Sequence, residues 1–337
     1  MPAIRTEITE IVTGLALLGY RDLAQALEVR PGHILNVEAE HFDRLAGALA
    51  DGDHDDEFAT AWDNGVVFAR SNDGLRGRPP WSVEWKGPHR PPGYEQIPAD
   101  LRVDHVYLIS CKYGSTILHN VSPAHLFDRL LAERRIERGG DWFGDVAPEA
   151  YQDLYDAYRR ELGLDGLPDR VGDLERGHRA ALKAAAPADR RWPGAAADVY
   201  RDLIVAVAQA SAERWRGRLT TRASREEMLW RILRFQAAPY FVLGSSTTGH
   251  PTRYRVATPS DFRHAFDLRS IDVWPDPAGQ PLVRWRADAV GRMTGDRKVI
   301  EGHVEVRWSH GRFSGAPEAK VHLDTPPHDV AGYFPLR

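Results

Sequence analysis

The 337-residue chain contains one cysteine, three methionines and no long apolar run. The single cysteine, Cys111, excludes an intramolecular disulfide framework and a cysteine-rich zinc site. An apolar run of about 18 residues, the length that a membrane-spanning helix needs, does not occur. The N-terminal stretch carries acidic residues where a signal peptide needs a basic region. The default expectation is therefore a cytoplasmic protein.

Several sequence motifs of common enzyme classes are also missing. The chain has no Gly-rich P-loop, no GxGxxG that opens a helix and no GxSxG elbow, which argues against nucleotide hydrolysis, a dinucleotide cofactor and a serine hydrolase. The 14 histidines are scattered and form no HExxH pair, so a dedicated zinc site has little support. The net charge is −4, whereas nucleic-acid-binding domains are often strongly basic.

The most informative segment, between residues 72 and 118, combines acids, lysines and apolar runs. The runs SVEWKG and VYLISCKYG are typical of strands, and each ends in a lysine two residues after an acidic or polar residue. The pairs are Glu84 with Lys86 and Ser110 with Lys112. Residues i and i+2 of a strand point to the same face. Each pair therefore presents an oxygen ligand beside an ammonium group.

Carboxylates beside a lysine suit metal-assisted attack on a phosphodiester. Magnesium prefers oxygen ligands, and one or two carboxylates plus phosphate oxygens hold it. The bound ion polarises the phosphoryl oxygen and lowers the pKa of a bound water, while a lysine orients that water. These residues predict a phosphodiester-cleaving site that uses Mg²⁺ or Mn²⁺.

The segment resembles the PD-(D/E)xK nuclease superfamily, whose members place an aspartate near one strand and a (D/E)xK triplet on the next. Two registers are open. In the first, Asp73 is followed by ten residues and then by the triplet from Glu84 to Lys86, with a hairpin made by the turn at 74–80. Glu57 would then supply the helix-borne carboxylate that many members carry.

In the second register, Asp100 or Asp104 precedes the triplet from Ser110 to Lys112. Ser110 stands where the family has a carboxylate, so Glu84 on the adjacent strand would replace the missing acid. The two candidate catalytic sets are thus Glu84, Asp104 and Lys112 on one side, and Asp73 with Glu84 and Lys86 on the other. The metal ligands that the resemblance implies come from Glu57, Asp73, Glu84 and Asp104.

Basic residues crowd the same region, as expected if a phosphate backbone passes there. They include Arg76, Arg78, Arg90 and Arg102. The late turn WSHGRFSGAPEAK, which carries His310 and Arg312, is a second candidate for substrate recognition. The ordinary alternative is that these loops are simply solvated.

The pattern of elements predicts an α+β protein, and the resemblance implies a restriction-endonuclease-like mixed α/β core within it. Apolar residues at helical spacing predict amphipathic helices over 4–28 and 38–50. The runs YFVLG, TRYRVAT, PLVRWRADAV, KVIEGHVEVRW and EAKVHL predict an antiparallel sheet near the C-terminus. Four consecutive regions follow, namely an N-terminal helical region (1–54), a candidate nuclease core (55–135), a helical region (136–237) and an antiparallel β-rich recognition region (238–337).

The predicted function is a magnesium-dependent endonuclease that acts on nucleic acid, with DNA as the expected substrate. A role in restriction or defence follows by family analogy alone, and a homodimer would suit cleavage of both strands. One alternative is a non-catalytic protein that binds nucleic acid or a protein partner through its Arg- and Trp-rich C-terminal sheet. Another is a hydrolase that uses Cys111 with His105 or His119, which the apolar surroundings of Cys111 disfavour.

Overall fold

The computed structural model describes residues 4–87, 99–132, 140–187, 191–235 and 239–337. The chain divides into two compact units, and both are assembled from segments far apart in the sequence. Unit 1 comprises Met1–Thr116, Arg234–Phe266 and Pro326–Arg337, and unit 2 comprises Ile117–Leu233 and Asp267–Thr325. Both units contain helices and a sheet, which confirms the predicted α+β class.

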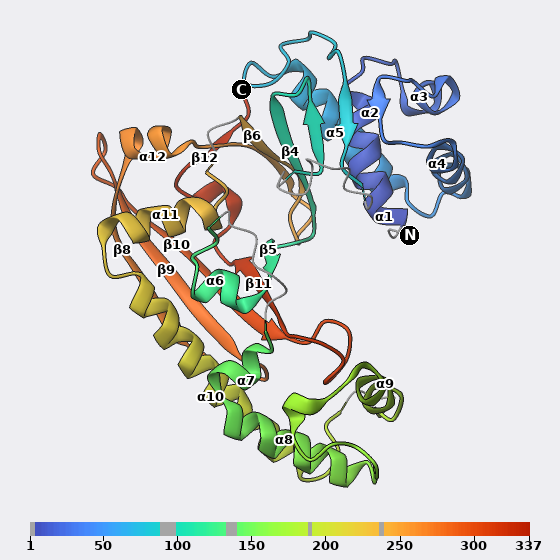
Figure 1. Ribbon diagram of the computed structural model, residues 1–337. Helices are drawn as coiled ribbons and strands as arrows, with labels where there is room; N and C mark the ends of the chain where they lie inside the picture. The colour runs from blue at the N-terminus through green and yellow to red at the C-terminus, as the bar shows by residue number, and fades with distance from the viewer. Residues whose placement is uncertain (1–3, 88–98, 133–139, 188–190, 236–238) are drawn as a thin grey trace. The chain divides into compact units, whose positions relative to one another are not determined.

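Unit 1 is built on a seven-stranded mixed sheet of order β1-β2-β3-β4-β6-β7-β12 (Figure 1). Strands β2, β3 and β4 form an antiparallel meander, whereas β6 runs parallel to β4. The strands are β1 (Ile34–Leu35), β2 (Val83–Trp85), β3 (Leu101–Val103), β4 (Tyr107–Tyr113), β6 (Tyr240–Ser245), β7 (Pro251–Val256) and β12 (Tyr333–Pro335).

The N-terminal helices of unit 1 pack on the meander and thereby bury the apolar stripe along one side of these helices. Ile8, Ile11 and Leu15 belong to one core cluster with residues of α5 and of strands β2 to β4. The helices of this unit are α1 (Ile4–Glu7), the π-helix η1 (Ile8–Val12), α2 (Thr13–Ala16), α3 (Leu23–Val29), α4 (Ala39–Asp51), α5 (Asp55–Arg70), α12 (Pro259–Ala265) and the 3₁₀ turn η3 (Pro327–Asp329).

Unit 2 contains a five-stranded antiparallel sheet of order β5-β11-β10-β9-β8. Its strands are β5 (Ile117–Val121), β8 (Phe266–Pro275), β9 (Leu282–Gly291), β10 (Arg297–Arg307) and β11 (Glu318–Leu323). Burial alternates along β9 and β10, so each strand has one face in the core and one polar face.

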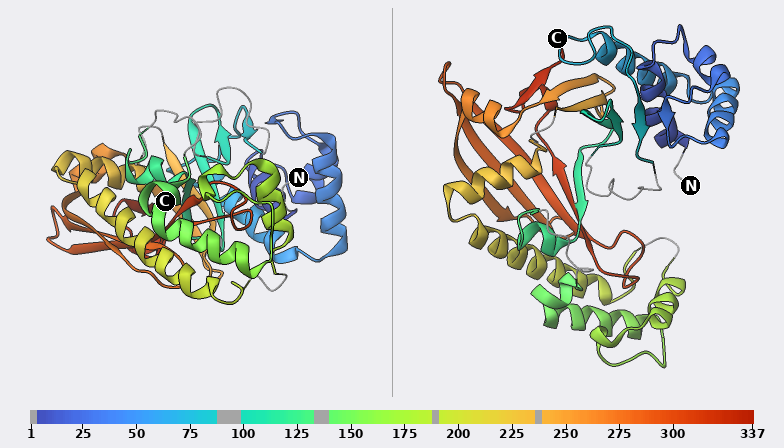
Figure 2. Two further views of the ribbon diagram at one scale, coloured as in Figure 1. Left: turned by 60° about the horizontal axis from the view of Figure 1, so that its bottom comes forward. Right: turned by 45° about the horizontal axis from the view of Figure 1, so that its top comes forward.

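Helices cover the buried face of the unit 2 sheet. The long helix α10 contacts β9 and lies beside α8 (Figures 1 and 2). The described helices of unit 2, of which α6 and α10 contact the sheet, are α6 (Pro123–Phe127), α7 (Trp142–Val146), α8 (Pro148–Glu161), the 3₁₀ turn η2 (Val171–Asp173), α9 (Arg176–Ala184), α10 (Ala196–Arg218) and α11 (Arg222–Ile232). No helix in the described ranges is long and apolar enough to cross a membrane.

The structure contains the helices predicted over 4–28 and 38–50, the helical middle region and the five predicted C-terminal strands. The C-terminal region is β-rich as expected, but its strands belong to two sheets. Strands β6 and β7 join β4 in unit 1, whereas β9, β10 and β11 lie in unit 2 with β8, which was not predicted. The two compact units do not coincide with the four consecutive regions. The boundary between β4 of unit 1 and β5 of unit 2, for example, falls inside the region 55–135.

Candidate functional site

The hairpin required by the first register does not form. Helix α5 ends at Arg70, and Asp73 lies in the turn that follows it, outside any strand. Its carboxylate accepts a hydrogen bond from the Arg337 backbone N–H (3.0 Å) and lies 3.6 Å from Arg255 Nε. Glu57 is helix-borne as predicted, in the first turn of α5, but it pairs with Arg5 at 3.2 Å. Asp73 is therefore not the strand-borne neighbour of β2 that the hairpin prediction needed.

Glu84 on β2 is buried, and its carboxylate pairs with basic side chains of the same unit. Its side chain is 1% exposed, and it pairs with Arg102 Nη2 at 2.5 Å and with His105 Nδ1 at 2.6 Å. Arg102 is the register partner of Glu84 on β3, so the sheet itself sets this contact. A buried carboxylate needs such partners, since an unpaired one is strongly destabilising.

Asp104 also has structural partners. It lies in the β3–β4 turn with φ +50°, rather than on the strand of Lys112. Its carboxylate accepts hydrogen bonds from the backbone N–H groups of Trp81 (2.6 Å) and Ser82 (3.2 Å) and pairs with Arg78 at 2.5 Å. These contacts lower the pKa of Asp104 despite partial burial, which opposes them. Glu57, Asp73, Glu84 and Asp104 form no metal-sized group of three within the described residues.

The predicted phosphate-binding residues mostly have partners inside the protein. Arg78 and Arg102 pair with Asp104 and Glu84, and Arg76 Nε donates to the Asn72 carbonyl. Arg90 lies outside the described residues.

His310 and Arg312 lie on the turn between β10 and β11 of unit 2. His310 Nε2 is 3.9 Å from Glu318, and its side chain is largely exposed. The Arg312 guanidinium lies 4.0 Å from the ring centroid of Trp192 and donates to the Arg191 carbonyl. Arg312 therefore holds this turn against the helical part of unit 2.

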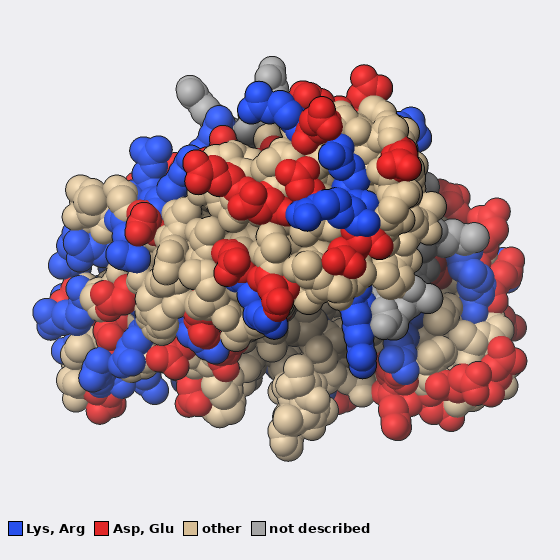
Figure 3. All heavy atoms as spheres, turned by 90° about the horizontal axis from the view of Figure 1, so that it is seen from below, with Lys and Arg blue, Asp and Glu red and all other residues tan. Residues whose placement is uncertain are grey.

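The polar face of the unit 2 sheet is a mixture of charges. Arg284 pairs with Asp276 at 2.5 Å, Arg286 pairs with Asp288 at 3.2 Å, and Trp285 is buried on the other face. Figure 3 likewise shows basic and acidic side chains interspersed over one face of the molecule. The arginines of this sheet are thus largely neutralised, which weakens the argument for it as a phosphate-binding surface.

A different group of ionisable residues meets where β3 begins. Glu10, on the π-helix η1, accepts a hydrogen bond from Trp85 Nε1 at 2.6 Å. Burial and, to a smaller extent, the Asp100 carboxylate raise the pKa of Glu10 to about 8, although the Trp85 hydrogen bond, Lys112 and Lys86 oppose the shift. Glu10 is therefore a desolvated carboxyl that has a second carboxylate nearby.

Asp100 immediately precedes β3, and its side chain accepts a backbone hydrogen bond from β4 where the pairing of the two strands ends. Its Oδ2 accepts hydrogen bonds from the Cys111 backbone N–H (2.6 Å) and from Ser110 Oγ (3.2 Å). Its own carbonyl accepts a hydrogen bond from Lys86 N–H at 2.9 Å. Trp85 is the register partner of Leu101, the next residue after Asp100. The indole that holds Glu10 thus brings that carboxyl to the same end of β3.

Two lysines flank Asp100 from the neighbouring strands. Lys86 follows the end of β2, and Lys112 lies on β4 two residues after Ser110, so Ser110 and Lys112 share a face. Both lysines are half-buried. Within the described ranges, no ion pair of Lys112 is found, and its charge acts on Glu10 and Cys111 at longer range. The start of β3 therefore holds two carboxylates and the Ser110 hydroxyl, and the two lysines act on Glu10 only through their charge at longer range.

Cys111 lacks the surroundings of a nucleophile. Burial raises the pKa of its thiol, and the nearby Asp100 and Glu10 raise it further. His105 contacts Glu84 in the β3–β4 turn, and the His119 ring pairs with the Ile232 carbonyl in unit 2. These environments disfavour the cysteine-hydrolase alternative.

Sequence reasoning missed Glu10 and left Asp100 as one of two choices. Glu10 did carry a usable signal, because it is a carboxyl inside the stretch ITEIV, whose other four residues are buried. A charged residue among buried neighbours is rare unless it is paired or functional. The distinction between Asp100 and Asp104 required the strand register and the position of the turn.

Glu10 also predicts a pH dependence of stability. Its pKa rises from an ordinary 4.5 to about 8 on folding, so between these values the folded protein binds more protons than the unfolded chain. The free energy of unfolding should therefore fall as the pH rises through this window, by up to about 1.4 kcal/mol per pH unit. Glu10→Gln keeps an oxygen for Trp85 and should remove this part of the slope. Urea unfolding of both proteins at several pH values measures it, and identical slopes would contradict the assignment.

Comparison of the chain with protein-family models, with curated proteins and with solved structures finds no match. Arguments about function therefore start from the contacts of the residues themselves.

Proposed function

We propose that unit 1 is a nuclease that depends on a divalent cation, with Glu10 and Asp100 as the metal ligands. The observation that carries the proposal is the convergence of a helix-borne carboxyl and the Asp100 carboxylate beside the strand-borne triplet Ser110 to Lys112. This arrangement favours the second register, with Asp100 as its aspartate. An aspartate near one strand and a lysine-ending triplet on the next are the features on which the PD-(D/E)xK resemblance rests.

The oxygen atoms of this site suit a hard cation. Glu10 uses Oε2 and Asp100 uses Oδ2 for the hydrogen bonds described above. Their second oxygens, Oε1 and Oδ1, accept no hydrogen bond within the described residues. One or two carboxylates, completed by waters and phosphate oxygens, are enough to hold Mg²⁺. Because Ser110 replaces a carboxylate, we expect weaker binding than three acidic ligands would give.

The cation, when bound, would supply a water of lowered pKa and a polarised phosphoryl oxygen. The protein's own groups would do the rest. The Lys112 ammonium would orient the attacking water and stabilise the charge that develops on the phosphate. Lys86, on the other side of Asp100, would bind a flanking phosphate group.

The test is cleavage of plasmid, single-stranded DNA and RNA by the purified chain with Mg²⁺, Mn²⁺ or EDTA. Cleavage that requires the cation and stops with EDTA is the expected result. Binding of nucleic acid without any cleavage would overturn the proposal and favour the non-catalytic alternative. Comparison of the three substrates also identifies the class of nucleic acid, and the broader suggestion of restriction or defence depends on that outcome.

A further inference from the structure

A second group of metal-ligating side chains lies on the polar face of the unit 2 sheet. His303 and Glu305 are two residues apart on β10, and His322 on β11 is the register partner of His303. The strand period and the pairing therefore place all three side chains on one face. The two imidazole rings stack with centroids 4.5 Å apart and an interplanar angle of 2°.

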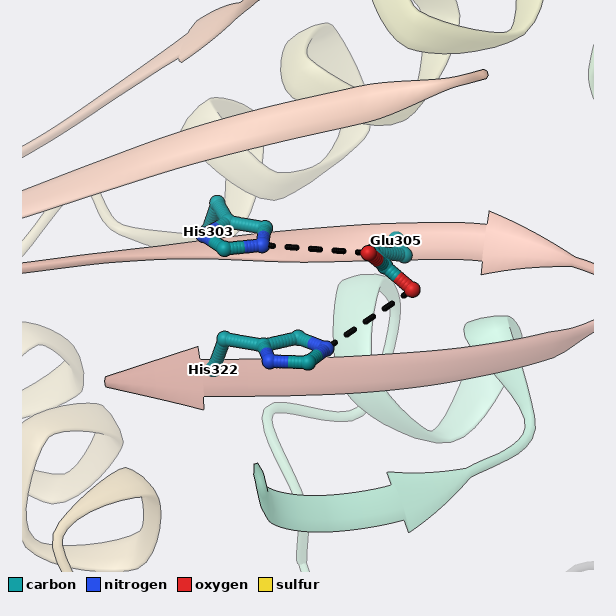
Figure 4. A group of neighbouring side chains, drawn as sticks. All are labelled: His303, Glu305 and His322. Atoms are coloured by element: carbon teal, nitrogen blue, oxygen red, sulfur yellow. Dashed lines mark ion pairs between the residues drawn. The ribbon is translucent and has the colours of Figure 1, made fainter. Parts of the chain in front are cut away.

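The potential ligand atoms of these residues face one another. Figure 4 shows both imidazoles directed toward the Glu305 carboxylate. His303 Nε2 lies 4.0 Å from Glu305 Oε1, and His322 Nε2 lies 3.7 Å from Oε2. Ligands of one tetrahedral zinc ion, with bonds of about 2.1 Å, lie roughly 3.4 Å apart. Small side-chain rotations would therefore close the group around an ion.

Asp324 supports the same geometry from behind His303. Its two carboxylate oxygens lie 2.8 and 3.0 Å from His303 Nδ1. An ionised carboxylate only accepts, so Nδ1 carries the proton and the lone pair of neutral His303 lies on Nε2, toward Glu305. A carboxylate that holds the outer nitrogen of a histidine is the usual support of a metal-ligating imidazole. Arg284 Nη1, 3.4 Å from Asp324, helps to fix that carboxylate.

Burial and the stacked neighbouring ring favour a neutral His322. Two protonated rings stacked at this distance would repel each other. Burial lowers the pKa of His322, and the neighbouring His303 lowers it further. Arg307 Nη1 lies 3.4 Å from Glu305 Oε2, so a metal ion would compete with this guanidinium for the Glu305 carboxylate. The side chains of His303, Glu305 and His322 are only 22%, 16% and 14% exposed, so the site is partly shielded from water.

We propose that His303, Glu305 and His322 bind a zinc ion on the unit 2 sheet. Two imidazoles and one carboxylate match the borderline character of Zn²⁺ better than that of Mg²⁺, which prefers oxygen ligands. Three protein ligands leave a fourth position for a water or a substrate atom. This site involves other residues and another class of metal than the proposed nuclease centre, so the two proposals stand or fall separately.

The test is zinc binding by the full chain after removal of metals with a chelator. Competition with a chromophoric chelator should show about one tight equivalent per chain, and Co²⁺ should give the visible absorption of a tetrahedral site. We expect His303→Ala and His322→Ala each to weaken binding at least ~100-fold, and Asp324→Asn to weaken it ~10-fold through loss of orientation. His310→Ala, an exposed histidine of the same unit, is the matched control and should bind as the wild type does.

Thermal unfolding without metal shows whether each variant is folded. His322→Gln, which keeps a polar side chain, replaces His322→Ala if the latter does not fold. The proposal is overturned if the wild type binds no zinc tightly, or if folded variants at His303 and His322 retain its affinity. It is also overturned if His310→Ala weakens binding as much as they do.

Discussion

Asp100→Asn is expected to lower the rate of Mg²⁺-dependent cleavage at least ~100-fold, which is the usual scale for loss of one essential charged group at a reacting centre. The asparagine oxygen still accepts the hydrogen bonds of Cys111 N–H and Ser110 Oγ that Asp100 accepts in the structure. The fold should therefore persist while the negative charge that would hold the cation is lost. Initial rates on plasmid DNA, with the melting temperature as a check of folding, measure the effect.

Two other aspartates provide matched controls for this variant. Asp73 contacts Arg337 and Arg255, and Asp104 caps a turn beside Arg78. Asp73→Asn and Asp104→Asn should retain most of the activity after correction for the folded fraction. Loss of activity in a folded Asp104→Asn, with Asp100→Asn active, would restore the set of Glu84, Asp104 and Lys112. Loss only with Asp73→Asn would restore the first register.

Gly65→Ala is expected to destabilise unit 1 by about 2–3 kcal/mol, the upper part of the range for overpacking a closely packed core. Gly65 is a buried residue of α5, at the contact with α2. An added Cβ would lie 2.4 Å from the Thr13 carbonyl oxygen and 2.6 Å from the Ala16 Cβ. Because the closest atom belongs to the backbone, the two helices must move apart. Urea unfolding gives the change in free energy.

Gly47→Ala is the matched control on another helix. Gly47 lies inside α4, and an added Cβ there meets no atom within 4 Å. Alanine should therefore stabilise the protein by about 0.5–1 kcal/mol through its higher helix propensity. Equal effects of the two substitutions would contradict the close approach of α2 and α5.

The sequence alone predicted the parts of the candidate site that depend on local pattern. The strand around Ser110 and Lys112 follows from its apolar residues, and the lysine position follows from the two-residue period of a strand. The helix of Glu10 was also predicted. Its meeting with Asp100 was not, because it depends on how η1 packs on the meander through Trp85.

The local sequence pattern also does not predict which strands pair with one another. Alternating residues identify a strand but not its neighbours, so β6 and β7 were expected beside β9 and β10. The same reason explains why His303 and His322 passed as scattered histidines. They face each other only because β10 and β11 pair in one particular register.

The central claim is that Glu10 and Asp100 hold a divalent cation, and the most direct test is a measurement of Mn²⁺ binding. Electron paramagnetic resonance detects the binding because the signal of the free ion decreases. The measurement uses a His303→Ala/His322→Ala background, so that the unit 2 histidines do not contribute. If Glu10 and Asp100 hold the cation, this protein binds Mn²⁺, and adding Glu10→Gln and Asp100→Asn abolishes binding while the protein remains folded. Unchanged Mn²⁺ binding after both substitutions, or no binding before them, would contradict a metal-dependent site at the start of β3.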